Sequence, residues 1–469
     1  MGTHPESCDL LIRNGYVVTM DNGRRVFPAG AVAVNEKRIV AVGPEREVAA
    51  AWRGHRVIDA GGAPVHPGLI DGHYHVTMHG TRGAMSDDPA KPALGGAGGV
   101  SPYGQWFNAM TAEDEFASAQ HASLEMLANG YTCFLEAGTV FDTDAVAEAV
   151  EGVGIRAVLG DPFLWDLTGG MAMASELDRA PVDLARCLSA IGRECRRNDD
   201  PDALVRGHIA VYGSGTASDE LLLAGKEAAD RHGVVLNQHQ SLAPGGVARE
   251  DERLGRHPFV HFAELGLLAD NTTYVHLNVL REDEVEAIAG SGMSAVWHPA
   301  NYQFYAIGTA IPPRIPELHG RGVNVALGSD IAKLWTIGEG PLIGYLLARE
   351  WGGYLTAEAM FEMQTRAAAR AAGLADRIGS LEVGKRADIV IRSRALGESH
   401  PGLNPVQEMV LVGRTKTVDT VIVDGETVLR GGRSVRVDEG AVHAASRASA
   451  RRLAEITGQS PGTIWPETA

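Results

Sequence analysis

Eight short apolar runs recur through the middle of this 469-residue chain, with helical stretches between or after them. The first run ends near residue 70, and the others cover residues 131–135, 157–159, 207–212, 234–236, 273–276, 294–297 and 323–327. A strand followed by a helix, repeated eight times in roughly 300 residues, predicts an α/β fold, namely a (β/α)8 TIM-like barrel. Repeat number alone leaves a doubly wound open sheet as the alternative.

Short strands also fill both ends of the chain. Near the N-terminus, apolar runs flank turns such as Asn14-Gly15, a pattern typical of β-hairpins. Further apolar runs occupy residues 387–391, 418–423 and 427–429. The pattern predicts a small β-sandwich domain formed by both chain ends. The expected divisions are residues 1–66 plus 376–437 for the sandwich, 67–375 for the barrel domain and 438–469 for a C-terminal helical tail.

Composition excludes several classes of protein. The formal net charge is −17, from 42 basic and 59 acidic residues, so a nucleic-acid partner is not expected. No apolar run approaches the length of about 18 residues that a membrane span needs, and the polar first residues do not resemble a secretory signal. Four scattered cysteines without a CxxC pair predict a reduced, cytoplasmic protein. A small-molecule substrate is the partner that fits this composition.

Side chains that bind divalent metals stand where the predicted strands end. These residues are His73, His75, His239, His276, His298 and Asp330. The carboxyl ends of barrel strands meet at one face, and imidazoles with a carboxylate suit zinc or a similar ion. Taken singly, each residue has an ordinary structural explanation; Asp330, for example, can cap a helix. Their coincidence at successive strand ends predicts a metal-dependent active site.

Three segments resemble the amidohydrolase superfamily. Residues 65–75, with the sequence VHPGLIDGHYH, are similar to its first-strand signature, in which proline, glycine and a polar residue precede His-x-His. Residues 325–330, VALGSD, resemble its eighth strand, and residues 379–390, GSLEVGKRADIV, resemble the return of the chain into its small β-sandwich. The segments span nearly the whole chain in the right order. The layout resembles the branch that contains cytosine deaminase and triazine hydrolase.

The resemblance implies a role for the residues at the strand ends. The implied metal ligands are His73, His75, His239 and Asp330, with Asp330 also catalytic and His276 beside the water or substrate. Family members that bind two ions commonly carry a carbamylated lysine at the end of the fourth strand, and no lysine ends the fourth run here. We therefore expect one divalent ion; zinc is favoured, with iron, manganese and cobalt as alternatives. The residues expected to contact the substrate are Gln240, His298 and Asn301. Enzymes of this branch are often homo-oligomers, and we expect the same here.

Two departures from the family pattern bear on the substrate. Deaminases of this branch carry a glutamate three residues after the fifth-strand histidine, where this chain has Leu242. The seventh-strand segment, Trp297-His298-Pro299-Ala300-Asn301, places a histidine just before the proline. Both departures resemble the branch that contains phenylurea hydrolases and molinate hydrolase.

The sequence therefore predicts a metal-dependent hydrolase that cleaves a C–N bond of a urea, carbamate, thiocarbamate or amide. A phenylurea-type substrate and a role in xenobiotic degradation fit this prediction. In this hypothesis Asp330 takes a proton from metal-activated water and passes it to the leaving amine, and His276 polarises the carbonyl oxygen. The alternative is a heteroaromatic deaminase or dechlorinase for triazine- or nucleobase-like rings. A non-enzymatic binding protein is disfavoured, because a full set of ligand types is present.

Overall fold

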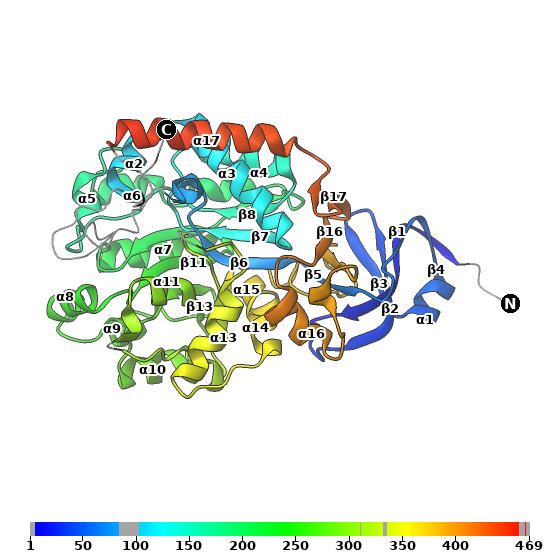
Figure 1. Cartoon of the computed structure of the whole chain (residues 1–469). Coiled ribbons are helices and arrows are strands. Elements are labelled where there is room, and N and C mark those ends of the chain that lie inside the picture. The colour runs from blue at the N-terminus through cyan, green and yellow to red at the C-terminus, as the bar shows by residue number, and fades with distance from the viewer. Residues whose placement is uncertain (1–4, 84–102, 310, 332–334, 459–464, 466–469) are drawn as a thin grey trace.

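The apolar runs of the middle region form parallel strands that close into a barrel. The structure, a computed structural model, describes residues 5–83, 103–309, 311–331, 335–458 and 465 (Figure 1). Within that part of the chain, the barrel strands are β6 (Leu69–Tyr74), β7 (Tyr131–Glu136), β8 (Arg156–Leu159), β9 (Val205–Gly207) continued by β10 (Ile209–Gly213), β11 (Leu236–Gln240), β12 (Thr272–His276), β13 (Ser294–Trp297) and β14 (Asn324–Leu327). Neighbours pair in this order, and a parallel bridge between Tyr74 and Asp330 closes the array. The predicted (β/α)8 barrel is confirmed, because an open sheet would not close.

Helices connect successive strands and lie outside them (Figure 1). They are α2 (Tyr103–Ala109), α3 (Ala112–Ala128), α4 (Thr143–Val153), α5 (Ala172–Glu176), α6 (Leu184–Ala190), α7 (Asp219–His232), α8 (Pro244–Leu254), α9 (Pro258–Glu264), α10 (Glu282–Ala289), α11 (Pro299–Phe304), α12 (Ile315–Gly320), α13 (Gly340–Glu350), α14 (Ala357–Met363) and α15 (Arg366–Ala371), with 3-10 helices η1 (Val76–Thr81), η2 (Arg193–Asn198) and η3 (Ile307–Thr309). Capping defines several ends: Thr111 and Asp114 form a capping box at the start of α3. Gly233 ends α7 in the left-handed conformation.

Apolar side chains fill the barrel and leave one end for polar groups. One buried cluster takes Ile70, Cys133, Leu135, Val158, Val275, Val296 and Ala326 from the strands and several alanines from α15. Helix α15 covers the N-terminal ends of the strands, where Thr273 donates to the carbonyl of Ala371 and Asn324 to that of Ala367. The C-terminal ends are therefore the ones that can present a site, as in other barrels of this kind.

Strands from both chain ends join in one nine-stranded mixed sheet. They are β1 (Glu6–Val18), β2 (Val26–Asn35), β3 (Arg38–Pro44), β4 (Trp52–Asp59), β5 (Pro64–Pro67), β15 (Ile389–Arg392), β16 (Val418–Val423), β17 (Glu426–Arg430) and β18 (Arg433–Ser434). The two ends meet where β5 pairs with β15 in the register His66↔Val390. The short helices beside this sheet are α1 (Glu45–Ala51), η4 (Gly397–Ser399), α16 (Pro405–Glu408) and the π-helix η5 (Met409–Gly413). The predicted bounds of the domains stay a prediction.

The last helix, α17 (Glu439–Ile456), returns to the barrel and packs along α3 (Figure 1). Asp438 caps its N-terminus through the N–H groups of Gly440 and Ala441. Ser449 donates to Asp114 of α3 (2.7 Å), and Arg452 pairs with the same carboxylate. No helix in the described ranges is both long and apolar enough to cross a membrane.

Candidate active site and metal centre

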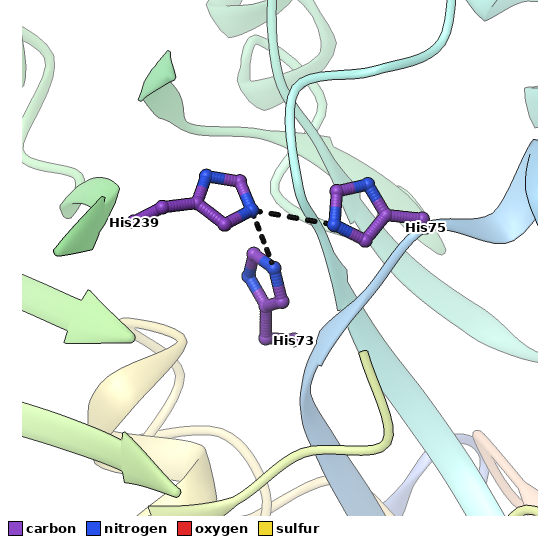
Figure 2. Close-up of side chains that lie close together, drawn as sticks. All are labelled: His73, His75 and His239. Atoms are coloured by element: carbon purple, nitrogen blue, oxygen red, sulfur yellow. Dashed lines mark hydrogen bonds between the residues drawn. The ribbon is translucent and has the colours of Figure 1, made fainter. Parts of the chain in front are cut away.

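Three histidines direct their rings at one another in the mouth of the barrel (Figure 2). His73 lies in β6, His75 directly follows that strand, and His239 lies in β11. The Nε2 atom of His239 is 3.1 Å from Nε2 of His73 and 3.3 Å from Nε2 of His75. Residues i and i+2 of an extended segment point to the same side, so His73 and His75 reach this point together. All three side chains are buried.

Asp330 completes the group from the residues after β14. Its Oδ1 lies 3.2 Å from Nε2 of His75, and its backbone N–H donates to the carbonyl of His73 (2.9 Å). Asp330 has a φ of 57°, a left-handed conformation that costs energy in residues other than glycine and collects at functional sites. The contact between the ends of β14 and β6 thus holds the carboxylate against the histidines. We call His73, His75, His239 and Asp330 the barrel-mouth cluster.

The spacing of the barrel-mouth cluster fits one divalent metal ion. Ligand atoms about 2.1 Å from a tetrahedral ion lie about 3.4 Å apart. The contacts His73–His239, His75–His239 and His75–Asp330 are 3.1, 3.3 and 3.2 Å long. Burial lowers the pKa of His73 and of His239 well below the usual range, so both rings are neutral and have a lone pair to give. Three imidazoles and a carboxylate are a donor set that zinc and similar ions accept.

Hydrogen bonds on the far side of two rings decide which nitrogen faces the centre. Nδ1 of His239 lies 2.8 Å from the carbonyl oxygen of Tyr212; a carbonyl only accepts, so Nδ1 carries the proton and Nε2 the lone pair. Nδ1 of His75 lies 3.0 Å from Oγ1 of Thr139, whose single hydroxyl proton goes to Glu136 (2.8 Å). His75 therefore donates through Nδ1 as well. Such outer hydrogen bonds commonly orient metal-binding histidines.

His276 and His298 lie beside the barrel-mouth cluster and contact each other. His276 ends β12 and His298 follows β13, and their Nδ1 atoms are 3.0 Å apart. The ring of His276 lies 5.5 Å from that of His239, and the ring of His298 lies 5.1 Å from that of His73. His276 has a φ of 80°, so its backbone is strained in the same way as that of Asp330. The mouth therefore gathers all the histidines predicted from the strand ends.

The side-chain amides of Asn301 and Gln240 each donate a hydrogen bond to a carboxylate. Asn301, in α11, donates through Nδ2 to Oδ2 of Asp330, so it holds the cluster carboxylate. Gln240 is fully buried and donates through Nε2 to Glu250 of α8 (2.8 Å). Its neighbour His239 points into the mouth, and adjacent strand residues point to opposite sides. Substrate contact by these two residues stays a prediction, and the amide of Gln240 is turned toward the helical layer.

Comparison with known proteins places the chain in a family. The model of the amidohydrolase family matches residues 65–428. The chain belongs to the amidohydrolase family. As a member, it is a hydrolase that acts on carbon–nitrogen bonds, which confirms the predicted enzyme class. The family and the histidine-rich mouth together support a divalent metal ion as its cofactor.

Relatives of this amidohydrolase are similar over almost their whole length. The 5-methylthioadenosine/S-adenosylhomocysteine deaminase of Syntrophobacter fumaroxidans is 32% identical over 447 residues, which are 92% of this chain and 95% of the relative. The crystal structure of an adenosine deaminase from Xanthomonas campestris with bound zinc has a TM-score of 0.84 at 26% identity, covering 96% of this chain and 100% of that one. A triazine hydrolase variant has a TM-score of 0.82 at 22% identity, covering 94% and 99%, and shows the shared fold.

These relatives change the expectation about the substrate. The deaminase names favour the alternative considered from the sequence, a heteroaromatic deaminase, over hydrolysis of a urea or thiocarbamate. The expected closeness to phenylurea hydrolases and molinate hydrolase, with a role in xenobiotic degradation, is not supported by them. The urea prediction depends on Leu242, which stands where deaminases of the branch have glutamate, and the deaminase names of the relatives outweigh this single difference. In this amidohydrolase Leu242 is half-buried, and its carbonyl accepts the side-chain N–H of Asn278 (3.1 Å).

Three further residues support the site and were not among the predicted ones. Glu136 and Thr139 fix the ring of His75, and Tyr212 fixes His239 and packs its own ring 4.7 Å from that histidine. Glu136 ends a predicted strand, so the strand-end rule could have included it. Tyr212 acts through its backbone carbonyl, and residue type carries no signal for such a contact.

Proposed function

We propose that this amidohydrolase is a metal-dependent deaminase, which replaces the amino group of a heteroaromatic ring of the aminopurine type with oxygen from water. The observation that carries the proposal is the barrel-mouth cluster beside His276, in a chain whose relatives are named as deaminases of adenosine compounds. Release of ammonia from such a ring needs a strengthened water nucleophile and a route for protons, and the residues of the mouth can supply both.

His73, His75, His239 and Asp330 would hold the ion, and the zinc named for the adenosine deaminase of Xanthomonas campestris makes zinc the first choice. When bound, such an ion lowers the pKa of water toward about 7 and so supplies hydroxide at neutral pH. The chain contributes the geometry: the Nδ1–H bonds of His75 and His239 turn their Nε2 lone pairs inward before any ion arrives.

Asp330 is the residue best placed to move protons. Oδ1 faces His75, and Oδ2 accepts from Asn301, so the carboxylate is held with both oxygens at the mouth. In the proposed reaction it accepts the proton of the attacking water and returns it to the leaving amine. Asn301 is a positioning residue in this scheme, because its hydrogen bond fixes the plane of the carboxylate.

His276 faces the developing charge, and His298 sets its protonation. The Nδ1–Nδ1 contact of 3.0 Å needs one proton between the two rings. Nε2 of His298 is buried and has no hydrogen-bond partner; an orphaned N–H is costly, so His298 keeps its proton on Nδ1 and donates it to Nδ1 of His276. His276 then carries its own proton on Nε2, from which it donates to the substrate where negative charge or a lone pair develops.

One specific observation favours a second candidate function, hydrolysis of an acyclic urea or amide. Leucine at position 242 cannot deliver a proton to a ring nitrogen, and an acyclic carbonyl substrate does not require that step. Under the deaminase proposal the His276–His298 pair or Asp330 must deliver it. The two functions differ in product, because one releases ammonia from a ring and the other an amine from a chain.

The test is a product screen on the zinc-loaded protein. Adenosine, 5-methylthioadenosine, S-adenosylhomocysteine and an aminotriazine are compared with a phenylurea and a thiocarbamate, with ammonia, amine and ring absorbance measured separately. We expect ammonia from at least one aminopurine compound, lost in Asp330→Asn and kept in the exposed control Asp270→Asn. Amine release from the urea without ammonia from any ring compound would overturn the proposal in favour of the second candidate.

A further inference from the structure

A second group of metal-binding side chains lies outside the barrel strands, between η1, α3 and α17. It consists of His79 in η1 and of His121 and Glu125 in α3. One possible ligand atom from each residue lies within 4.8 Å of the others. We call these three residues the outer cluster. The proposed reaction uses none of them.

One nitrogen of the buried His79 ring has no hydrogen-bond partner. Its Nδ1 lies 2.7 Å from the hydroxyl oxygen of Tyr74. Its Nε2 makes no hydrogen bond but lies 3.4 Å from Oε2 of Glu125. A buried polar atom without a partner is costly and calls for an explanation. Two ligands of one tetrahedral ion are about 3.4 Å apart, so the two atoms are spaced as ligands would be.

His121 presents its ring to the same point. The ring centroids of His79 and His121 are 4.5 Å apart, with planes crossing at 85°. Nδ1 of His121 lies 2.9 Å from Oγ of Ser446 in α17, which leaves Nε2 as the coordinating atom. This is the arrangement that His75 has with Thr139 in the barrel mouth, a hydrogen bond at one nitrogen that orients the other.

The outer cluster can be reached from solvent. Glu125 keeps 15% of its side chain exposed, and His121 is only partly buried. His443 of α17, also partly exposed, lies beside His121 with ring centroids 5.3 Å apart. Glu125 and His121 therefore leave the cluster partly open to solvent, whereas His79 is enclosed.

Arg82 determines which ions suit this place. Its Nη1 donates to Oε2 of Glu125 (2.5 Å) and its Nη2 to Oε1 (3.0 Å). The guanidinium charge opposes an incoming cation, and one shared carboxylate is a poor site for magnesium or calcium, which need several oxygen ligands. The two imidazoles favour zinc, nickel or copper instead.

We propose that the outer cluster is a second binding site, weaker than the barrel mouth, for zinc or a similar nitrogen-preferring divalent ion. His79, His121 and Glu125 are its ligands, and water completes the coordination. The ion bridges η1 to α3, and Ser446 extends the link to α17. Tyr74, which lies between His73 and His75 in sequence and contacts His79, connects the outer cluster to the strand that carries the catalytic histidines.

The experiment counts zinc ions per chain and does not depend on the reaction. Protein is dialysed against zinc buffers that rise through the micromolar range, and bound zinc is measured by mass spectrometry after circular dichroism has shown that each variant is folded. We expect two ions in the wild type and in His55→Asn, an exposed histidine outside both clusters. We expect one ion in His121→Asn, which keeps a polar group toward Ser446, and one in His239→Asn.

Two outcomes separate this proposal from the proposed function. Equal zinc in His121→Asn and the wild type would overturn the outer site, whatever the enzyme does. Unchanged zinc in His239→Asn would instead count against the catalytic site. Ser446→Ala, a milder change that leaves all three ligands, should weaken the second binding step about 10-fold; an unchanged second step in that folded variant would likewise contradict the role given to His121.

Discussion

The barrel-mouth cluster and the outer cluster use similar ligands but are built differently. In the mouth, the ligands follow strands whose ends converge, and backbone contacts such as Asp330 N–H to the carbonyl of His73 fix their places. In the outer cluster, the ligands come from η1 and α3. Hydrogen bonds to the side chains of Tyr74 and Ser446 orient the two histidines, and the backbone N–H of Ile337 donates to Glu125 (3.0 Å). The comparison teaches that converging strand ends preorganise a site, whereas a site between helices depends more on contacts between side chains.

The carboxylates of the two clusters differ in charge environment. Asp330 contacts the imidazole of His75 and accepts from the amide of Asn301. Glu125 already pairs through both oxygens with Arg82. A cation in the outer cluster must share its carboxylate with a guanidinium, and for that reason we expect it to bind more weakly there.

Asp330→Asn should give the largest effect. The amide keeps the size of the carboxylate but accepts protons poorly, so we expect kcat to fall about 1000-fold or more, in the range seen for general acid–base groups. The measurement is single-turnover kinetics with the deaminated substrate identified in the product screen, together with the zinc content of the same sample. A variant with full zinc and near-normal kcat would show that the mouth works without this carboxylate.

Glu115→Gln tests whether α3, which carries two outer ligands, has a pH-dependent stability. Burial raises the pKa of Glu115 to about 7, although the N–H groups of Phe141 and Asp142 and the charge of Arg179 oppose the shift. The folded state thus holds a proton that the unfolded state releases near pH 4.5, and the free energy of unfolding falls as pH rises from about 4.5 to 7, by roughly 2–3 kcal/mol. Glu115→Gln should remove this decline in urea titrations, and an unchanged pH dependence would contradict the shift.

His298 variants test whether the mouth contains a positioning pair that the outer cluster lacks. Asparagine retains an N–H that can face Nδ1 of His276, whereas leucine retains only the bulk of the ring. We expect kcat to fall about 10-fold in His298→Asn and about 100-fold in His298→Leu, with little change in KM, because the lost interaction acts on the transition state. Equal loss in both variants, or a change confined to KM, would assign His298 to packing or substrate binding.

The barrel and the grouping of the mouth histidines could both be predicted from the sequence, because both follow from the alternation of strands and helices. Parallel strands end on one face, so polar residues after apolar runs meet there. Gln240 shows a limit of that rule: it adjoins His239, but strand alternation turns its amide to Glu250. The outer cluster could not be predicted from the sequence. His79 lies in η1, His121 and Glu125 lie in α3, and no local sequence pattern specifies how these two helices pack. The substrate class depended on one residue, Leu242, and the relatives outweighed it.

Arg82→Met gives the smallest expected effect and bears most directly on the comparison. Methionine retains much of the apolar stem but removes the charge, so Glu125 no longer shares its carboxylate with a guanidinium. We expect zinc binding at the outer cluster to tighten about 10-fold, the size of one nearby charge in a partly buried site, while binding at the barrel mouth stays unchanged. Competition titration with a zinc indicator measures both steps, and Arg24→Met, which breaks an exposed pair with Glu362, is the matched control. If zinc binding at the outer cluster weakens instead, Arg82 is needed to hold Glu125 in place. The two clusters would then differ in how firmly the carboxylate is positioned rather than in its charge environment.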